Sequence, residues 1–376
     1  MSWSVDARPV APSATVAMAD KVRRLAAQGR DIVSLAVGEP AFGAPEAVVG
    51  ATCRALVAGE SRYGPVGGLP ELRDRLARQL KQPGPDNILI TNGAKQALYT
   101  LFQVLIRPGD EVILPRPCWV SFEHQIRLAG GTVTAVDLPD HRLDPESLAA
   151  AVTPRTRAIL INSPNNPTGA VFDPAALEAV AALAAERDLL LIADEAYIDF
   201  FFDGQAPVCL AVLPDAADRT VTIRSFSKSY GLTGFRVGYA AGPERVIAAM
   251  AAVQSHSTGN VCTFAQHGAL AAMDLPESWL AERRREMAAN RDLALDLARQ
   301  WFDCIRPQGA FYLFPDVRRH LGRGETAADF TLRLLETAGV ALVPGEAFGR
   351  PGCVRISFSV PAERITAAFD RLGGVL

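Results

Sequence analysis

Lysine is scarce in this chain of 376 residues. Only Lys21, Lys81, Lys95 and Lys228 stand among 38 basic residues, and all the others are arginines. An arginine side chain stays protonated, whereas a lysine can lose its proton and attack a carbonyl carbon. Each of the four lysines is therefore a candidate for chemistry that arginine cannot perform.

The chain also lacks the marks of several protein classes. Its six cysteines include no Cys-x-x-Cys pair and its five histidines show no metal-ligand spacing, so no metal site is expected. No apolar run is long enough to cross a membrane, and no signal peptide is recognised. A net charge of −3 leaves no basic surplus for nucleic acid. We therefore expect a cytoplasmic protein with reduced thiols and neither a membrane nor a nucleic-acid partner.

Two patterns of secondary structure divide the chain. Up to about Pro243, short β-branched runs alternate with amphipathic helical stretches, which predicts an α/β fold with a mostly parallel sheet. Beyond it helices dominate, with short strands expected at residues 311–314, 340–343 and 354–359, which indicates a smaller α+β domain. Because one core seldom serves so many residues, we expect a large domain over residues 42–275 and a small domain of residues 1–41 with 276–376. The expected strands of the sheet are residues 87–91, 111–114, 132–136, 158–162, 189–193, 220–224 and 237–241.

Candidate functional residues follow several of these strands. Lys228, in Ser-Phe-Ser-Lys, is expected on a loop at a carboxyl end, where open α/β sheets bind ligands. Arg236, set among glycines, can approach a phosphate with a bidentate fork. Asp194 ends an apolar strand and can hold a pyridinium nitrogen protonated, with Tyr197 three residues on. Each feature alone is equally typical of an ordinary loop or helix cap.

Two further segments add polar groups. Residues 162–169 combine two X-Pro steps with a glycine, which predicts a rigid loop that fixes the Asn166 amide. Gly93, Ala94 and Lys95 open an expected helix, and the backbone N–H groups at a helix start bind phosphate.

The motifs TNGAKQALY, PRPCWVSF, NSPNNPTG, DEAY, SFSK and GFRVGY occur in this order. Together they resemble the class I/II aminotransferases of fold type I, which use pyridoxal phosphate (PLP), and most closely the bacterial aspartate aminotransferase branch. The resemblance runs from about Pro12 to Arg355. It implies a large domain with a seven-stranded, mostly parallel sheet between helices, a smaller α+β domain, and PLP as cofactor. Phe235 departs from the tryptophan common before the phosphate arginine, which is a packing change.

The resemblance also implies roles for the residues around the cofactor. Lys228 would anchor PLP and carry the substrate α-proton, Asp194 would pair with the pyridine nitrogen, and Tyr197 and Asn166 would bond the ring 3-oxygen. Trp119 would stack on the ring. The phosphate would be held by Gly93, Ala94, Lys95, Ser225 and Arg236, with Tyr63 from a neighbouring subunit. That last role implies a homodimer with shared active sites.

The substrate contacts implied by the resemblance lie at two places. Arg355 would clamp the α-carboxylate, with Gly38 as a backbone donor and Asn166 nearby. Ser13, Thr15 and Lys95 would bind a distal carboxylate, so aspartate and glutamate lead as amino donors in a ping-pong transamination with a 2-oxo acid.

Alternatives remain at this point. The same site would serve a C–S β-lyase, a decarboxylase or a cyclase, because fold and cofactor underdetermine the reaction. Aromatic or guanidino amino acids in secondary metabolism are also open. A PLP-sensing domain of a transcription regulator is disfavoured by the acidic charge and the short segment before Pro12. Asp199 would favour a basic substrate if it faced the site, and His256 would line the entrance if it came from a partner subunit.

Overall fold

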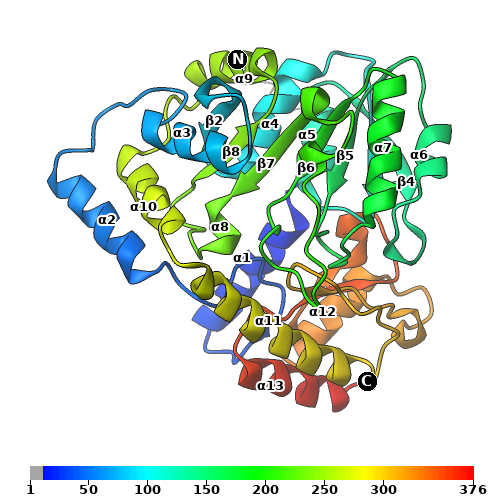
Figure 1. Cartoon of the computed structure of the whole chain (residues 1–376). Helices are drawn as coiled ribbons and strands as arrows, with labels where there is room; N and C mark the ends of the chain where they lie inside the picture. Colours follow the sequence, from blue (N-terminus) through cyan, green and yellow to red (C-terminus); the bar gives the residue numbers. More distant parts are fainter. Residues whose placement is uncertain (1–11) are drawn as a thin grey trace, which may run out of the picture.

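A seven-stranded sheet stands at the centre of the larger part of the protein (Figure 1). The computed structural model describes residues 12–376. The strand order is β2-β8-β7-β6-β5-β3-β4, and only β8 runs antiparallel to its neighbours. Each strand lies within two residues of an expected run, so the predicted α/β sheet is confirmed. The bounds are β2 (Ile88–Thr91), β3 (Glu111–Arg116), β4 (Thr132–Asp137), β5 (Thr156–Asn162), β6 (Leu190–Asp194), β7 (Thr220–Ser225) and β8 (Gly238–Ala241).

Helices cover both faces of this sheet. On one face α4 (Ala94–Leu105), α5 (Ser121–Leu128) and α9 (Glu244–Ser255) bury their apolar sides against the strands. On the other, α6 (Pro145–Ala150) and α7 (Pro174–Glu186) do the same. The central strands are therefore apolar on both sides, as expected. The edge strand β4 is the exception, since most of its residues are partly or fully exposed.

A third group of helices packs beside β2 and β8. α2 (Glu46–Val57), α3 (Pro70–Gln79) and α10 (Thr263–Met273) share a core with those two strands. The short 3-10 helices are η1 (Pro85–Asn87), η2 (Pro139–His141), η3 (Leu210–Val212), η4 (Ala217–Arg219), η5 (Arg318–His320) and η6 (Gly345–Phe348). Within residues 12–376, no helix combines the length and the apolar composition that crossing a membrane requires.

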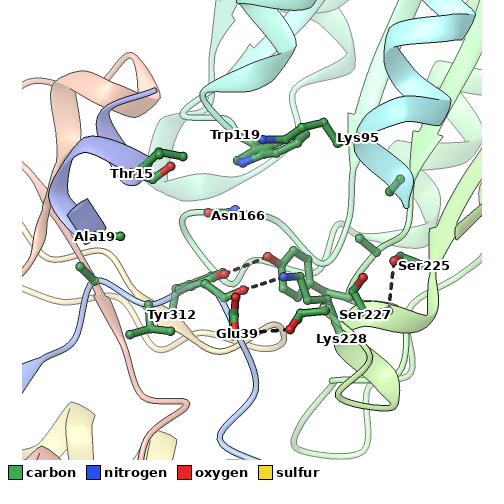
Figure 2. Close-up of a pocket in the computed structure, with 18 of the residues that line it drawn as sticks. Thr15, Ala19, Glu39, Lys95, Trp119, Asn166, Ser225, Ser227, Lys228 and Tyr312 are labelled. Atoms are coloured by element: carbon green, nitrogen blue, oxygen red, sulfur yellow. Dashed lines mark hydrogen bonds between the residues drawn. The ribbon is translucent and has the colours of Figure 1, made fainter. Parts of the chain in front are cut away.

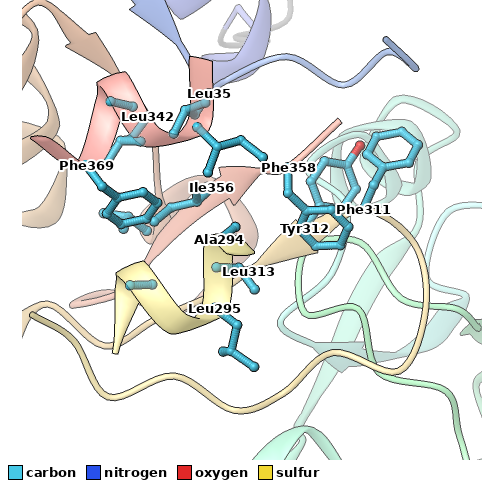
Figure 3. Packing of buried hydrophobic residues seen from close by; sticks show 14 of the residues in the cluster. Leu35, Ala294, Leu295, Phe311, Tyr312, Leu313, Leu342, Ile356, Phe358 and Phe369 are labelled. Carbon is cyan, nitrogen blue, oxygen red and sulfur yellow. The ribbon is translucent and has the colours of Figure 1, made fainter. Parts of the chain in front are cut away.

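The smaller part has its own core, which joins the two ends of the described chain. β1 (Val33–Ser34) pairs in parallel with β10 (Val340–Ala341), and β11 (Val343–Pro344), β12 (Val354–Ser357) and β9 (Tyr312–Leu313) form a three-stranded sheet. Leu35, Leu295, Ile356 and Phe369 meet in its interior (Figure 3). The helices here are α1 (Ala14–Ala27), α11 (Glu277–Ala298), α12 (Ala327–Thr337) and α13 (Ala362–Gly373). The expectation for residues 1–11 lies outside the described residues.

Two local expectations were wrong. Residues 340–343 form two short strands in place of one, because Val340 pairs with Val33 while Val343 pairs with Arg355 of a different sheet. Lys228 lies on a single helical turn, α8 (Phe226–Ser229), and not on a loop. The hydroxyl of Ser225 accepts a hydrogen bond from the Ser227 N–H at 3.1 Å, which caps this helix directly at the end of β7.

The ends of three neighbouring parallel strands set the place of the site. The parallel strands β5, β6 and β7 end at Asn162, Asp194 and Ser225, so these residues lie together at the carboxyl end of the sheet. Asn162 pairs directly with Asp194. Since α8 follows β7 directly at this end of the sheet, Lys228 lies near Asn162 and Asp194.

Candidate active site

A cavity of about 690 Å³ opens at this edge of the sheet. It is lined by segments far apart in the sequence, from α1 to β12, and Figure 2 shows residues from Thr15 to Tyr312 around it. All but three of the residues predicted for cofactor, catalysis or substrate line it, the exceptions being Ser13, Tyr63 and Gly93. The predicted residues found in its wall are Thr15, Gly38, Ala94, Lys95, Trp119, Asn166, Asp194, Tyr197, Ser225, Lys228, Arg236 and Arg355.

The amine of Lys228 points into the cavity. Its Nζ donates a hydrogen bond to the Gly38 carbonyl oxygen at 2.6 Å. Burial lowers the pKa of Lys228 to about 8, while the carboxylate of Glu39 acts in the opposite direction. The neutral amine, which is the nucleophilic and basic form, is therefore accessible near neutral pH.

Asp194 presents a buried carboxyl group below the cavity. Only 4% of the residue is exposed, and its Oδ1 accepts a hydrogen bond from the Ala196 N–H at 3.0 Å. The Asn162 amide fixes the backbone by donating to the Asp194 carbonyl oxygen at 3.0 Å. Burial raises the pKa of Asp194 to about 7. A carboxylate held in this way gains from a cationic N–H partner, because pairing offsets its desolvation.

Tyr197 and Tyr312 form a hydrogen-bonded pair of hydroxyls in the cavity wall. Their oxygens lie 2.8 Å apart, and burial raises the pKa of both phenols. Both groups therefore remain protonated donors at neutral pH. The Asn166 side chain lies nearby and accepts a hydrogen bond from Arg355 at 3.0 Å.

Arg355 is a buried cation with part of its hydrogen-bonding capacity unused. It is 2% exposed, and it donates to the Ala36 carbonyl oxygen at 3.0 Å in addition to Asn166. The guanidinium lies 4.3 Å from the ring centroid of Tyr312. Among the described residues, its Nε has no hydrogen-bond partner. Because a buried unpaired donor is costly, this arginine suits an anionic ligand, above all a carboxylate.

A second cationic region lies where α4 begins. The N–H groups of Ala94 and Lys95 are at the helix start, beside the Arg236 guanidinium. Arg236 donates to the carbonyl oxygens of Thr233 at 2.9 Å and Asn92 at 3.2 Å, and these bonds hold it in place. Gly93 contributes space, since a Cβ there would lie 2.6 Å from an Arg236 nitrogen. Together with the Ser225 and Ser227 hydroxyls, these donors make a site for a phosphate group.

Lys95 supplies a second amine at the cavity wall. Its Nζ lies 5.1 Å from the Trp119 ring centroid, and burial together with Arg236 lowers the pKa of Lys95. Thr15 lines the cavity from α1 (Figure 2) and shares a hydrogen bond of 2.9 Å with Ser13. Ser13 itself does not line the cavity.

Three predicted or suspected residues lie elsewhere in the single chain. Tyr63 is fully exposed on the segment between α2 and α3, and His256 is exposed at the end of α9. Asp199 is not in the cavity wall, and its carboxylate accepts a hydrogen bond from Ser229. Asp199 is therefore not placed to bind the side chain of a basic substrate in this chain.

Several residues of the wall were missed by sequence reasoning. Glu39, Ser227, Thr233 and Tyr312 belong to it, as do side chains of α1. Tyr312 stands in an aromatic run typical of core strands, and α1 carries no motif of its own. Tyr312 and the side chains of α1 reach the site only through tertiary packing. Ser227, Glu39 and Thr233 lie within three residues of Lys228, Gly38 and Arg236, and this proximity is the only signal that the sequence offered for them.

The cavity residues fit pyridoxal phosphate. The cationic start of α4 suits its phosphate, the buried Asp194 suits a protonated ring nitrogen, and the Lys228 amine suits its carbonyl carbon. The unpaired Nε of Arg355 remains for the carboxylate of an amino acid.

Comparisons with known proteins agree with this geometry. The family model for aminotransferase class I and II matches residues 30–372. The aspartate/prephenate aminotransferase of Thermus thermophilus is 42% identical over 377 residues, which cover 97% of this chain and 96% of that protein. The aspartate aminotransferase of Geobacillus stearothermophilus is 39% identical over 374 residues, covering 96% and 95%.

A solved structure is similar over nearly the same length. It is the aspartate aminotransferase from Thermus thermophilus with maleate, with a TM-score of 0.93 and 40% sequence identity. The match covers 97% of each chain.

Proposed function

The chain belongs to the class I and II aminotransferases, and from that premise we propose that it moves the amino group of aspartate or glutamate to a 2-oxo acid. It is a PLP-dependent aminotransferase of fold type I. The choice of substrate rests on one observation, the Lys95 amine in the cavity wall beside Trp119, in a cavity that also contains Thr15. The names of the related aminotransferases, which include aspartate, support the same choice.

The cofactor would be held at three points. Gly93, Ala94, Lys95, Ser225 and Arg236 would bind its phosphate through N–H groups, a hydroxyl and a guanidinium. The Asp194 carboxylate would keep its ring nitrogen protonated, and Trp119 would cover one ring face. Tyr197 and Asn166 would donate to the ring oxygen. When bound, PLP supplies the carbonyl carbon that receives the amino group and a ring that withdraws electrons from the substrate.

Lys228 would act both as anchor and as base. Its neutral amine takes the proton from the α-carbon of the substrate, and burial makes that neutral form available. The Gly38 carbonyl oxygen, 2.6 Å from Nζ, holds the amine inside the cavity. Asp194 and Tyr197 would hold the cofactor in a fixed position relative to the Lys228 amine.

Arg355 would orient the substrate. Its unpaired Nε and the fork of its guanidinium would bind the α-carboxylate, with Gly38 as a backbone donor and Asn166 beside it. At the other end of the cavity, Lys95 and Thr15 would bind the side-chain carboxylate, with Ser13 supporting Thr15 through their hydrogen bond. Two cationic ends in one cavity favour a dicarboxylic amino acid.

A screen of half-reactions tests this proposal. The purified yellow enzyme is mixed with each amino acid in turn, guanidino ones included, and the cofactor absorption is followed. Aspartate and glutamate should convert it to the pyridoxamine form. Conversion by another class alone would overturn the substrate assignment. If no amino acid converts it and ammonia or keto products appear instead, the chain catalyses another PLP reaction.

A matched pair of variants sharpens the screen. Lys95→Met keeps the backbone N–H but removes the amine, so kcat/KM for aspartate should fall by about 10- to 100-fold, the worth of a charged hydrogen bond. The value for an apolar amino acid should not fall. Lys81→Met, at an exposed lysine outside the cavity, is the control. An equal loss for both classes of amino acid would contradict the role of Lys95 in side-chain selection.

We also propose an assembly and a location. Tyr63 is fully exposed, and α2 nearby exposes Val49, Leu56 and Val57, which supports a homodimer that shares its active sites across this surface. A core built from β1, β9, β12 and the C-terminal helices, apart from the cores on the two faces of the large sheet, supports a large domain over 42–275 and a small domain of 1–41 with 276–376. Tyr197, Phe200 and Phe202 of the large domain also pack in that core. The six free cysteines are consistent with a cytoplasmic enzyme.

A further inference from the structure

Asp199 lies on the same pair of turns as Tyr197. The Ile198 N–H donates to the Glu195 carbonyl oxygen at 3.1 Å, and the Phe200 N–H donates to the Tyr197 carbonyl oxygen at 2.9 Å. These two bonds make the segment after β6 compact. Asp199 and Tyr197 therefore belong to one compact segment.

Ser229 lies directly after Lys228 at the end of α8. It is 3% exposed, and its hydroxyl donates a hydrogen bond to Asp199 Oδ2 at 2.5 Å. Hydrogen bonds to a carboxylate are shorter and stronger than neutral ones. This bond connects the turn that carries Tyr197 with the helix that carries Lys228.

The helix α8 needs such external contacts. It has only four residues, and a single helical turn is not stable on its own. Its start is held by the Ser225 hydroxyl, which accepts from the Ser227 N–H at 3.1 Å. The Ser229–Asp199 bond holds the other end, so the two contacts enclose Lys228.

The charge of Asp199 does not explain its place. Burial, Glu39, Arg355, Arg236 and Lys95 account for the shifted pKa of Lys228. The ionisable groups that face Asp199 are Tyr230, at the end of α8, and Tyr239 of β8, and both have raised pKa values mainly through burial. The hydrogen bond to Ser229 is therefore the contact that relates Asp199 to Lys228.

We propose that Asp199 is a positioning residue for the catalytic lysine. Through Ser229 it fixes α8 against the Tyr197 turn, and so it sets where the Lys228 amine lies relative to Asp194 and Tyr197. This inference rests on the proposed role of Lys228 as cofactor anchor and base. The role of Asp199 differs from selection of a basic substrate, which would require the carboxylate inside the cavity.

Capture of PLP by the apoenzyme tests the proposal. The absorption of the lysine-bound cofactor is followed after PLP is added to wild type, Asp199→Ala, Asp199→Asn, Ser229→Ala and the double variant Asp199→Ala/Ser229→Ala. We expect Asp199→Ala and Ser229→Ala each to slow capture roughly 10-fold, which corresponds to one hydrogen bond. The double variant should be no slower than either single one, because both remove the same bond. Asp199→Asn should retain most of the rate, since its amide oxygen still accepts from Ser229.

Steady-state kinetics separate positioning from general damage. The Asp199→Ala variant should lose kcat while its KM for the amino donor stays unchanged, because Arg355 is untouched. Asp218→Ala, at an exposed carboxylate that does not line the cavity, is the control and should have the kcat and KM of wild type. If Asp199→Ala and the double variant do not fold, the comparison is made with Asp199→Asn and Ser229→Ala, since both substitutions are nearly isosteric.

Several outcomes overturn the proposal. If Asp199→Ala and Ser229→Ala capture PLP at the wild-type rate and only their melting temperatures fall, the Ser229–Asp199 bond contributes to stability alone. Additive losses in the double variant would mean that the two residues act separately. A changed preference of Asp199→Ala for basic amino acids would indicate that Asp199 selects the substrate. Lys228→Ala distinguishes the two proposals, because capture by that variant would refute the anchor role itself, whatever Asp199 does.

Discussion

Burial shifts the pKa values of individual ionisable groups in this cavity. Asp194 is the clearest case, because it is 4% exposed and its pKa is raised to about 7. In the unfolded chain the same carboxyl would have its ordinary pKa near 3.8. Between these two pH values the unfolded state holds fewer protons on this group, so the stability of the apoenzyme falls as pH rises through that window.

Asp194→Asn should therefore stabilise the apoenzyme at pH 8. The gain should be on the order of 1–4 kcal/mol, since each unit of pKa shift corresponds to about 1.4 kcal/mol, and it should shrink as the pH is lowered to 5. Urea unfolding of both apoenzymes at the two pH values measures it. Identical unfolding free energies at pH 8 would contradict the raised pKa. The variant should also lose transamination, which is the usual cost of stabilising an active site.

Among secondary-structure elements, β8 lies close to the start of α4, where we propose that the cofactor phosphate binds. Gly238 begins β8, and a Cβ there would lie 2.7 Å from the Ala94 nitrogen and from the Gly93 carbonyl carbon. Both atoms are backbone and cannot rotate away. The glycine thus permits the close approach of strand and helix on which the anion site depends.

Gly238→Ala should weaken PLP binding about 10-fold or more, because it moves the N–H groups of Ala94 and Lys95. Overpacking should also lower the free energy of unfolding by about 1–3 kcal/mol. Gly84→Ala is the control, since a Cβ there meets no atom within 4 Å. PLP titration of the apoenzyme, followed by absorption, gives both affinities. Wild-type affinity in Gly238→Ala would show that the helix start does not hold the phosphate.

The elements differ in how well the sequence predicted them. The strands of the large sheet were predicted within two residues, because buried strands carry a dense β-branched pattern that local context preserves. The motif residues at their ends, such as Asp194 and Lys228, line one cavity. Glu39 and Tyr312 were not predicted, because neither belongs to a motif, and Tyr312 lies on a strand that reaches the site by pairing with β12. The single turn of α8 was missed since one cap residue and four helical residues carry no periodicity.

An ion pair holds α11 against the segment that follows β6. Arg291 of α11 is 2% exposed, and it binds Asp203 with two hydrogen bonds of 2.8 and 3.0 Å. Its guanidinium also lies 4.7 Å from the ring centroid of Phe202. The bonds from Arg291 and Arg306 lower the pKa of Asp203 to about 2, so this stabilisation is present above the ordinary pKa and is lost as pH falls towards 2.

Arg291→Met should reduce the free energy of unfolding at pH 7 by about 1–3 kcal/mol. Breaking a fully buried pair costs more, but Asp203 is about half exposed and solvent screens it. Arg285→Met, at an exposed arginine on the same helix, should have little effect. Urea unfolding of both variants measures the difference. Equal midpoints would mean that the ion pair contributes nothing to holding α11 in place.

A homodimer with shared sites makes a prediction that a monomer cannot fulfil. Tyr63→Ala should weaken cofactor binding and Lys228→Ala should abolish activity. When the two are unfolded together and refolded, hybrid dimers regain one intact site, and activity should return to roughly a quarter of the wild-type value. Light scattering gives the mass in parallel. A monomer of full activity, or a mixture without recovery, would refute the shared site.

The pairing of β1 with β10 has a consequence for the order of synthesis. Val33 leaves the ribosome early, yet its partner Val340 is made more than three hundred residues later. At about 5–20 residues per second, the first strand waits roughly 15–60 s for the second. The segment that contains Gly38 and Glu39 waits with it. The newborn chain must therefore keep its apolar N-terminal stretch from aggregating during that interval, and the catalytic cavity closes only when translation is nearly over.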